Sequence, residues 1–445
     1  MPEELIKVVI SGDRMSAFLR VAPQASVTMQ DLRDALAREG VTTGISVAAL
    51  KEALEGKRGV FYRVASGATA EQEASAAGEP PVVALKFPES RGRPPERIYS
   101  GPGFREEWRR LRARGAVSAG DLLAFVRRSD KYPKATTVTG QRVVRIDFPD
   151  DMKPSQNAQV TADGTGIIAL RTGIPFHDST GIGVLDHIEI VGNLDASSGD
   201  VSFPGDLSVR GDVEQGCRVS ATGDILISGN LWGSATARGR IVVSGGINAP
   251  GETIEAGGSI TCRFAENSII RSLERVTVEE AIVHCVVETE RDVVVTGLHG
   301  RIVGGLVVAA LGVKASTIGS PMGVPTVVQL GVSPKLRREQ LRIERDLDKV
   351  TKDLERANLM TRSPLRTGDY DVLRLSRMRR HLQDQEAALR TKLESFREML
   401  RRFPKGYFVA DRVLPGVRVV MAADVKEFKS PADMIIMGAI PRETD

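Results

Sequence analysis

A short phrase that recurs between residues 186 and 317 constrains the fold of this chain more than any other feature. The phrase opens with glycine, continues with two apolar residues separated by a single residue, and closes with glycine. Its clearest copies are GDLSVRG, GDILISG and GRIVVSG, which begin at Gly205, Gly223 and Gly239. With degenerate copies from Asp186, Gly258, Glu274, Arg291 and Leu311, successive starts lie 19, 18, 16, 19, 16, 17 and 20 residues apart. This period is too short for a repeated pair of helices and fits one coil of a β-solenoid.

The two apolar positions of each copy predict one strand with an inward face, because alternation and β-branched side chains are typical of strands. In stacked coils Leu207 would lie between Ile188 and Ile225, and each buried side chain would contribute about 1.5–3 kcal/mol. A second, weaker strand-like segment follows in each coil, as at 218–220 and 253–255. The flanking glycines are expected at coil corners, where positive φ costs glycine nothing sterically. These features predict a mainly β chain built on a right-handed parallel β-helix (β-solenoid) of about eight coils.

The rest of the chain divides by composition into further parts. Thr28 is a candidate N-cap of one helix, and Gly56 is the expected end of a second helix over about 47–54. We expect a small α/β N-terminal domain at 1–66, followed by a linker at 67–81. Residues 82–181 form a mixed, β-rich region with a helix near 106–114, and the sequence does not determine its fold. The β-helix follows at 182–331.

Residues 332–405 change character, because apolar residues there recur at three-four spacing on both sides of a Pro/Gly-containing break at 362–368. This pattern predicts an inserted antiparallel coiled-coil hairpin. Residues 406–445 return to strand-like sequence. We therefore expect the chain to come back after the hairpin and cap the open end of the β-helix.

Positive charge is concentrated in the hairpin. Residues 335–405 carry 20 Lys and Arg against 12 Asp and Glu, whereas the net charge of the whole chain is only +4. The densest cluster consists of Arg374, Arg377, Arg379 and Arg380. One interpretation is a solvated coiled-coil face with i,i+4 ion pairs, and the other is a docking arm for an acidic protein, nucleic acid or anionic lipid. The absence of interleaved aromatic residues disfavours binding of single-stranded nucleic acid.

No motif predicts catalysis, a cofactor or a metal site. The five histidines are scattered, and HExxH, GxSxG and phosphate-binding loop motifs are absent. Cys217, Cys262 and Cys285 have no metal-ligand spacing, and Cys262 occupies an inward position, which predicts a buried, inert thiol. The corner aspartates Asp206, Asp212 and Asp224 are expected to accept hydrogen bonds from local backbone amides rather than to bind a cation. We therefore predict that the protein is not an enzyme.

Two glycine-containing segments, 299–305 and 317–323, lie one coil apart in the predicted β-helix. They form either tight corners at the end of the β-helix or a binding surface. The candidate partner-binding residues in these segments are Arg301, Gly304, Gly305, Ser320, Pro321 and Met322.

The chain has no run of eighteen apolar residues, which disfavours a transmembrane helix. Its first residues, MPEELIKVVISGD, do not resemble a secretory signal. We expect a cytoplasmic protein.

The phrases GNLDASSGDVSFPGDLSVRGDV, GRIVVSGGI, GRIVGG and STIGSPMG resemble the flagellar assembly protein A family. The resemblance extends to the hairpin, to VLPGVRVVM near the C-terminus and to VTTGIS in the first domain. It implies a β-helix with a coiled-coil hairpin, a non-enzymatic role in bacterial flagellar assembly or its regulation, and a location at the cell pole or the membrane periphery. The implied partners are flagellar assembly components or the unphosphorylated glucose-specific enzyme IIA of the sugar phosphotransferase system.

Four hypotheses therefore remain, and the last of them is binding of nucleic acid through the hairpin, which would weaken steeply with salt. The first is an intracellular scaffold that binds protein partners through the β-helix and the hairpin. The second is a self-assembling polymer, or another homo-oligomer, in which β-helices join end to end as in bactofilins. The third is a carbohydrate-active β-helix enzyme, which would need clustered carboxylates on one outer face. The sequence leaves open whether the hairpin dimerises.

Overall fold

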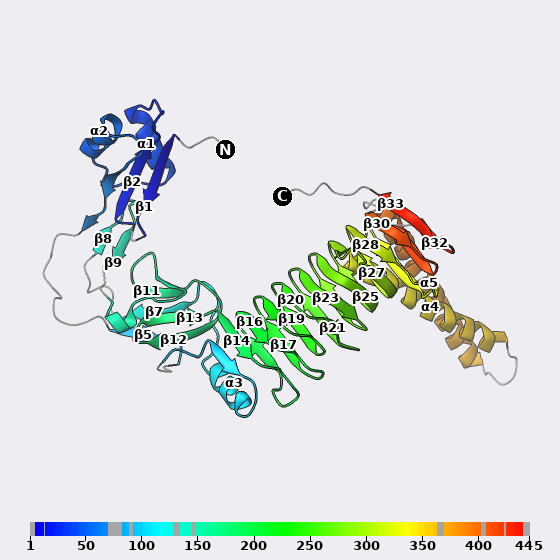
Figure 1. Ribbon diagram of the computed structural model, residues 1–445. Helices are drawn as coiled ribbons and strands as arrows, with labels where there is room; N and C mark the ends of the chain where they lie inside the picture. The colour runs from blue at the N-terminus through cyan, green and yellow to red at the C-terminus, as the bar shows by residue number, and fades with distance from the viewer. Residues whose placement is uncertain are drawn as a thin grey trace. The chain divides into compact units, whose positions relative to one another are not determined.

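The computed structural model describes residues 5–12, 14–69, 82–88, 92–127, 134–144, 148–362, 369–401, 406–421 and 424–438. It comprises two compact units (Figure 1). The first consists of Met1–Pro95 and Arg110–Asp186, and the second of Glu96–Arg109 and His187–Asp445. The predicted fold class is confirmed: the chain is mainly strands, with a β-solenoid of about 8 turns over residues 187–330 and an α4–α5 helix pair.

The first unit begins with the predicted α/β domain. Strands β1 (Ile6–Ile10), β2 (Ser16–Val21) and β3 (Phe61–Ser66) form an antiparallel sheet that packs against α1 (Met29–Arg38) and α2 (Val47–Glu55). The side chain of Thr28 accepts from the amide of Asp31, and the Asp31 carboxylate accepts from the amide of Thr28, so a capping box begins α1. Gly56 is the C-cap of α2, as the sequence predicts.

The fold of the following region was left open by the sequence, and the structure supplies it. The strands β5 (Val83–Leu85), β7 (Leu122–Val126), β11 (Gly166–Ala169) and β10 (Ala158–Val160) form an antiparallel sheet beside the hairpin of β12 (Ile174–Asp178) and β13 (Gly181–Leu185). Leu123, Ile167 and Ile182 lie in their common core. A smaller sheet joins β4 (Ala68–Thr69), β8 (Lys134–Thr136) and β9 (Arg142–Val144), and a 3-10 turn covers Asp150–Met152. Of the expected linker, residues 70–81 lie outside the described part of the chain.

The solenoid occupies the second unit as a series of parallel strands. These are β14 (His187–Val191), β15 (Val201–Phe203), β16 (Asp206–Arg210), β17 (Arg218–Ala221), β18 (Ile225–Ile227), β19 (Ser234–Ala237), β20 (Ile241–Val243), β21 (Ile247–Asn248), β22 (Thr253–Ala256), β23 (Ile260–Glu266), β24 (Ile269–Ser272), β25 (Val276–Thr289), β26 (Asp292–Val295), β27 (Arg301–Ala309), β28 (Gly312–Ile318) and β29 (Thr326–Leu330).

The predicted apolar ladder is present. Ile188 pairs with Leu207 and Leu207 with Ile225, and the register then continues through Ile241, Ile260, Val276, Val293 and Val313. All of these side chains are at most 1% exposed. The second ladder, through strands such as β17, β19 and β22, also lies where the sequence predicts it.

Each coil has a third side that the sequence analysis missed. Single-residue bridges connect Leu194 to Val213, Val213 to Leu231, and Leu231 to Ile247. The ladder continues as β21 pairs with β23. These side chains are fully buried, so the core is enclosed from three directions. Because most of these contacts involve one residue per coil, they leave no strand-length alternation in the sequence.

The expectation of positive φ at the corner glycines is confirmed at Gly192, where φ is +107°, but it is wrong for the clearest copies of the repeat. Gly223 and Gly239 do not have positive φ. Glycine is needed there because an added Cβ would lie 1.9 Å from Asp206 Oδ1 at Gly223, and 2.2 Å from Asp224 Oδ1 at Gly239. The carboxylate of one coil thus fills the space that a side chain in the next coil would need.

The corner aspartates bond the next coil rather than local amides, which corrects the prediction. Asp206 Oδ1 accepts from the amide of Asp224 at 2.7 Å, and Asp224 Oδ1 accepts from the amide of Arg240 at 2.9 Å. A parallel row joins Asp212 Oδ1 to the amide of Asn230 at 2.6 Å. These rows satisfy backbone donors at corners where the strand ladder is interrupted.

An earlier segment of the chain caps the first coil. Strand β6 (Arg97–Tyr99) pairs in parallel with β14, and α3 (Phe104–Arg112) follows it. In α3, Phe104 stacks on Trp108 at 5.7 Å between ring centroids, and Trp108 contacts Phe203 at 6.5 Å. The sequence predicted this helix near 106–114 but not its place at the end of the solenoid, because the contact spans about ninety residues of chain.

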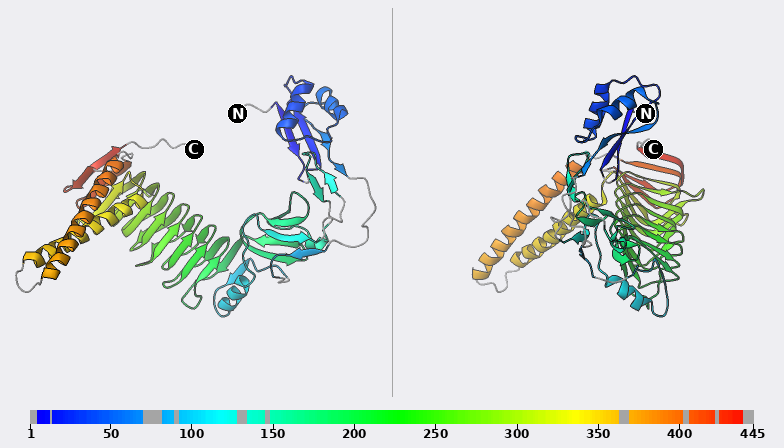
Figure 2. Two further views of the ribbon diagram at one scale, coloured as in Figure 1. Left: turned by 180° about the vertical axis from the view of Figure 1, so that it is seen from behind. Right: turned by 90° about the vertical axis from the view of Figure 1, so that its left-hand side faces the viewer.

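The hairpin is inserted between the last strands of the solenoid (Figure 2). Helices α4 (Pro334–Arg362) and α5 (Asp369–Arg401) separate β29 from β30 (Tyr407–Val413). The predicted break at 362–368 lies outside the described residues except for Arg362.

After the hairpin the chain resumes the solenoid. Strand β30 pairs in parallel with β28, and β31 (Val417–Met421) pairs in parallel with β29. Strands β32 (Asp424–Phe428) and β33 (Ala432–Gly438) then pair antiparallel with β31 and β30. The C-terminal segment is therefore first an added coil and only then a covering layer.

Candidate partner-binding surface

The structure brings the two glycine-containing segments together. Arg301 pairs with Thr317 and Ile302 with Ile318, so the start of β27 lies beside the end of β28. Together they form most of an open groove of about 430 Å³, which we call the β27–β28 groove. Its lining residues are Val283, His299, Arg301, Val303, Thr317, Gly319, Ser320, Pro321 and Leu414.

The predicted residues Arg301, Ser320 and Pro321 all line this groove. Arg301 is exposed, and its side chain has no hydrogen bond or ion pair to any residue that the structure describes. The hydroxyl of Ser320 accepts from the amide of Met322 at 3.2 Å, which holds the turn after β28. The groove therefore offers an unpaired guanidinium above apolar walls.

Gly304 and Gly305 do not line the groove. They are instead required by the backbone conformation of β27. Their φ values are +68° and +79°. An added Cβ would lie 2.5 Å from His284 Nδ1 at Gly304 and 2.1 Å from the carbonyl oxygen of Cys285 at Gly305. Both observations require glycine for the kink within β27.

Two apolar side chains near the groove are almost completely exposed. Met322, a predicted residue, follows Pro321 directly, and Leu298 precedes His299. Each is 92% exposed. Leu298 was missed by the sequence analysis because a single leucine in a turn has no periodic signal. Exposed apolar side chains beside a free arginine are typical of a protein-binding surface.

Leu414 is another groove residue that the sequence analysis did not find. It follows β30, the strand to which the chain returns after the hairpin, and its amide donates to the carbonyl of Ile318 at 2.9 Å. Segments of the chain 96 positions apart thus meet at this wall of the groove.

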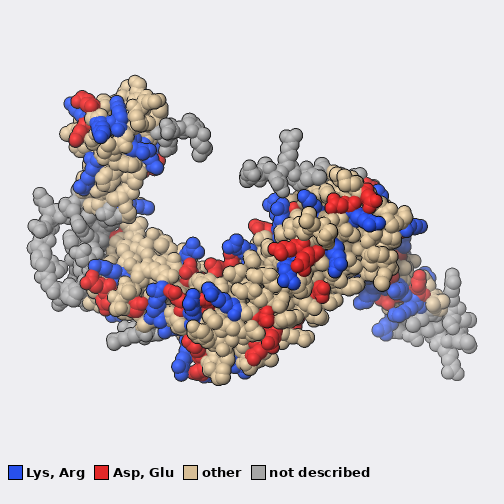
Figure 3. Space-filling model, in the orientation of Figure 1, with Lys and Arg blue, Asp and Glu red and all other residues tan. Residues whose placement is uncertain are grey.

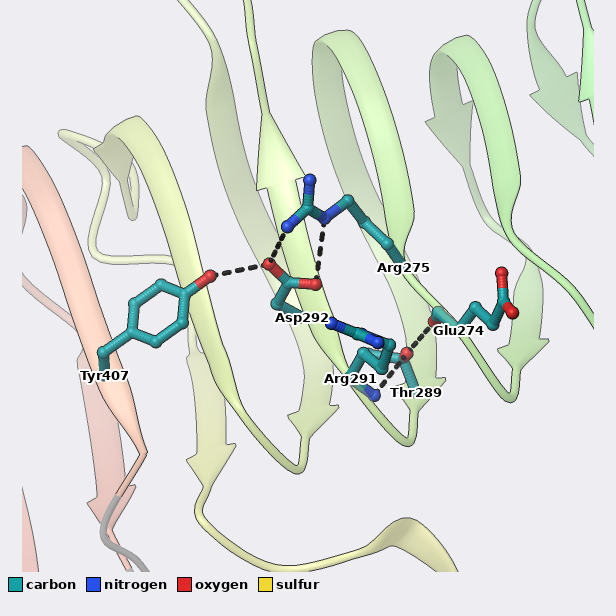
Figure 4. A network of polar contacts seen from close by, with 6 residues as sticks. All are labelled: Glu274, Arg275, Thr289, Arg291, Asp292 and Tyr407. Carbon is teal, nitrogen blue, oxygen red and sulfur yellow. Dashed lines mark hydrogen bonds and ion pairs between the residues drawn. The ribbon is translucent and has the colours of Figure 1, made fainter. Parts of the chain in front are cut away.

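A buried polar network holds β30 in place (Figure 4). The hydroxyl of Tyr407 donates to Asp292 Oδ2 at 2.7 Å. Arg275 contacts both oxygens of the Asp292 carboxylate at 3.0 Å. On the same side, Thr289 Oγ1 donates to the carbonyl of Glu274 and accepts from the amide of Arg291. Because Tyr407 begins β30 and Leu414 follows it, this network positions the C-terminal wall of the groove.

The four hairpin arginines form a separate set on α5. Arg374, Arg377 and Arg380 are exposed, and Arg379 is half-buried. None of the four forms a hydrogen bond or ion pair with a described residue. In Figure 3, Lys and Arg side chains gather where the described part of the hairpin lies.

The two grooves of the second unit differ in their carboxylates. No carboxylate lines the β27–β28 groove. A larger groove of about 770 Å³ over the first coils contains two carboxylates, Glu96 and Glu189, and both Arg97 and Arg210 pair with the buried carboxylate of Glu189. No group of three or more His, Cys, Asp or Glu side chains could hold a metal ion in the part of the chain that the structure describes.

All three cysteines are buried and free. Burial raises the pKa of the Cys262 thiol to about 12, and it raises the pKa values of Cys217 and Cys285 to about 11. A thiol in this state is a poor nucleophile, which agrees with the inert role predicted for Cys262.

No helix among the described segments combines the length and the apolar character needed to cross a bilayer. Two family models match the chain. The model of the Flagellar Assembly Protein A beta solenoid domain matches residues 186–437, and the model of the Flagellar Assembly Protein A N-terminal region matches residues 6–180. No curated protein and no solved structure matches the chain.

Proposed function

Since the chain belongs to the flagellar assembly protein A family, we propose that it is a non-enzymatic interaction protein in bacterial flagellar assembly or its regulation. In this proposal the β27–β28 groove binds a protein partner. The observation that carries the proposal is the unpaired Arg301 in a groove flanked by Leu298 and Met322, each 92% exposed.

The composition of the groove defines the partner chemistry. Its apolar residues would pack against an apolar side chain of the partner, and Arg301 would pair with a carboxylate beside it. Flagellar assembly components and the unphosphorylated glucose-specific enzyme IIA are the partners that we propose to test first. We propose the cytoplasm, including the cell pole and the membrane periphery, as the place of this interaction.

The test replaces the groove residues in the host. Deletion of the gene is complemented with the intact protein, with Arg301→Glu/Met322→Ser, or with Arg238→Glu. Arg238 is also exposed but lies outside the groove, so it is the matched control for the charge change. Flagella are counted by electron microscopy, and partners are captured by a photo-crosslinking residue placed at Leu298, which flanks the groove and is unchanged in both variants.

We expect the intact protein and Arg238→Glu to restore filaments and the groove variant to fail, while the crosslinked partner disappears only with the groove variant. Circular dichroism is the control for folding, and both variants should keep the strand content of the intact protein. Normal filaments and an unchanged crosslinked product with Arg301→Glu/Met322→Ser would show that the partner binds elsewhere.

The polymer hypothesis has one observation in its favour. Strand β33 ends the solenoid, and its side chains Met434 and Ile436 are exposed. Sedimentation at rising concentration separates the two functions, because a polymer grows without limit and a scaffold keeps a fixed size. Substitution of Ile436 by Lys should abolish growth if β33 joins copies end to end.

A further inference from the structure

The outer half of the hairpin differs in ion pairing from the half next to the solenoid. Near the solenoid, Arg397 pairs with Glu344 at 3.2 Å and Lys392 with Glu339 at 3.7 Å. Farther along α5, Arg390 pairs with Glu386 at 2.7 Å. Beyond that level Arg356 on α4 still pairs with Asp353 at 3.5 Å. On α5, by contrast, Arg374, Arg377, Arg379 and Arg380 have no partner among the described residues.

The sequence shows the same division. Residues 356–381 contain seven Lys and Arg against two Asp and Glu, whereas the remainder of 335–405 contains thirteen against ten. Arg374, Arg377 and Arg380 are three residues apart, so they follow one side of α5. The outer half therefore carries a net charge of +5, and three of its arginines form a row along α5.

Apolar side chains are exposed at the same level. The hydroxyl of Thr351 contacts the carboxylate of Glu386 at 3.3 Å, which sets the register of the two antiparallel helices. Eight residues farther from the solenoid on each helix lie Leu359, which is 67% exposed, and Met378, which is 53% exposed. Solvated coiled-coil faces do not need these side chains, whereas a lipid interface accommodates apolar residues between cations.

The base of the hairpin is tied to the solenoid. Ser333 donates to Glu290 at 2.8 Å, and Arg338 pairs with Glu288, which also pairs with Arg271 at 2.9 Å. At 1.5 Å per residue, Leu359 lies roughly 30 Å along α4 from Arg338. The basic row is therefore held away from the strands by an anchored pair of helices (Figure 2).

From these observations we propose that the outer half of the hairpin, at residues 356–359 of α4 and 374–381 of α5, docks onto an anionic lipid bilayer. Arg374, Arg377 and Arg380 contact the headgroups, and Leu359 and Met378 enter the interfacial layer. A bilayer fits better than nucleic acid, because residues 356–381 contain Tyr370 as their one aromatic residue. The docking site is independent of the groove and of the function proposed for it.

The test measures binding of the full chain to sedimenting vesicles. One set contains phosphatidylethanolamine with phosphatidylglycerol, and the other contains phosphatidylcholine alone. The variant Arg374→Gln/Arg377→Gln/Arg380→Gln removes three charges from the row. Lys352→Gln/Arg390→Gln/Arg397→Gln is the matched control, because it removes three charges from the ion-paired half. A third variant, Leu359→Ser/Met378→Ser, tests the apolar contact.

We expect binding to the phosphatidylglycerol vesicles that weakens with salt, and none to phosphatidylcholine. Each arginine near an anionic surface contributes about fivefold in affinity, so the row variant should bind about a hundredfold more weakly. The control should stay within about fivefold of the intact protein, and the apolar variant should also lose affinity.

Three results would overturn the proposal. The first is no binding to phosphatidylglycerol vesicles at low salt. The second is an equal loss with the control, which would indicate a response to net charge alone. The third is that the intact protein binds a polynucleotide or an acidic protein more tightly than it binds vesicles. This binding would be lost in the row variant and would not be displaced by vesicles.

Discussion

The contact between Gly223 and Asp206 predicts a specific non-additive effect on stability. Asp206 Oδ1 accepts from the Asp224 amide at 2.7 Å, and an added Cβ at Gly223 would lie 1.9 Å from that oxygen. In Gly223→Ala the carboxylate must leave its position, so this variant loses the same hydrogen bond as Asp206→Ala. A hydrogen bond to a charged acceptor contributes about 1.5–3 kcal/mol.

We therefore expect Asp206→Ala to cost about 1.5–3 kcal/mol. Gly223→Ala should cost about 1–3 kcal/mol more, because its Cβ would also lie 3.0 Å from the carbonyl carbon of Gly205. The double variant should cost no more than Gly223→Ala alone, so the sum of the single costs should exceed the double cost by about 1.5–3 kcal/mol. Asp206→Asn keeps an acceptor at the same place and serves as the control.

Native-state hydrogen exchange of the full chain measures these costs locally, through the amides of β16, β18 and β20. Solenoid coils interact with their neighbours, so exchange in the distant β29 should not change. Additive costs would refute the reasoning, because they would show that the glycine and the aspartate act separately. A harmless Gly223→Ala would refute it as well.

Two further predictions concern buried groups. Tyr407→Phe removes the hydrogen bond to Asp292 and should destabilise β30 by about 1.5–3 kcal/mol; faster exchange of β30 amides checks this, and unchanged exchange would contradict it. The thiols of Cys217, Cys262 and Cys285 have pKa values raised to about 11, 12 and 11, so the folded protein should resist iodoacetamide at a pH of about 8.5, where unfolded thiols react. Since the unfolded chain loses these protons first, the free energy of unfolding should fall as the pH rises from about 9 to 11, and a rise over this range in urea titrations would contradict the assignment.

Sequence reasoning succeeded where one residue type repeats at a fixed spacing. The inward ladder through Ile188, Leu207 and Ile225 could be predicted because alternation within a strand and the period between coils both appear in the sequence. The hairpin could be predicted because its apolar spacing differs from that of the strands around it. The third side of the coil, at Leu194 and Val213, could not be predicted, because one apolar residue per coil in a loop has no period.

Some residues of the candidate groove could likewise be predicted from the sequence, and others could not. Glycine-containing segments pointed to Arg301, Ser320 and Pro321, and their stacking follows from the period of the solenoid. Leu414 joins them only because the chain returns after the hairpin. Leu298 could not be predicted, because its exposure depends on how the turn before β27 folds.

The sequence by itself therefore determined the solenoid, its core and the inserted hairpin, because each depends on local periodicity and on the burial of apolar side chains. Only the tertiary structure decided which segments close the ends. Residues 97–99 pair with the first coil, and residues 407–413 and 417–421 pair with the last. The hydrogen bond from Tyr407 to Asp292 joins residues that the hairpin separates in the sequence. These are contacts between segments far apart in the chain, and their partners are selected by unpaired strand edges and buried charges that exist only after the coils have stacked.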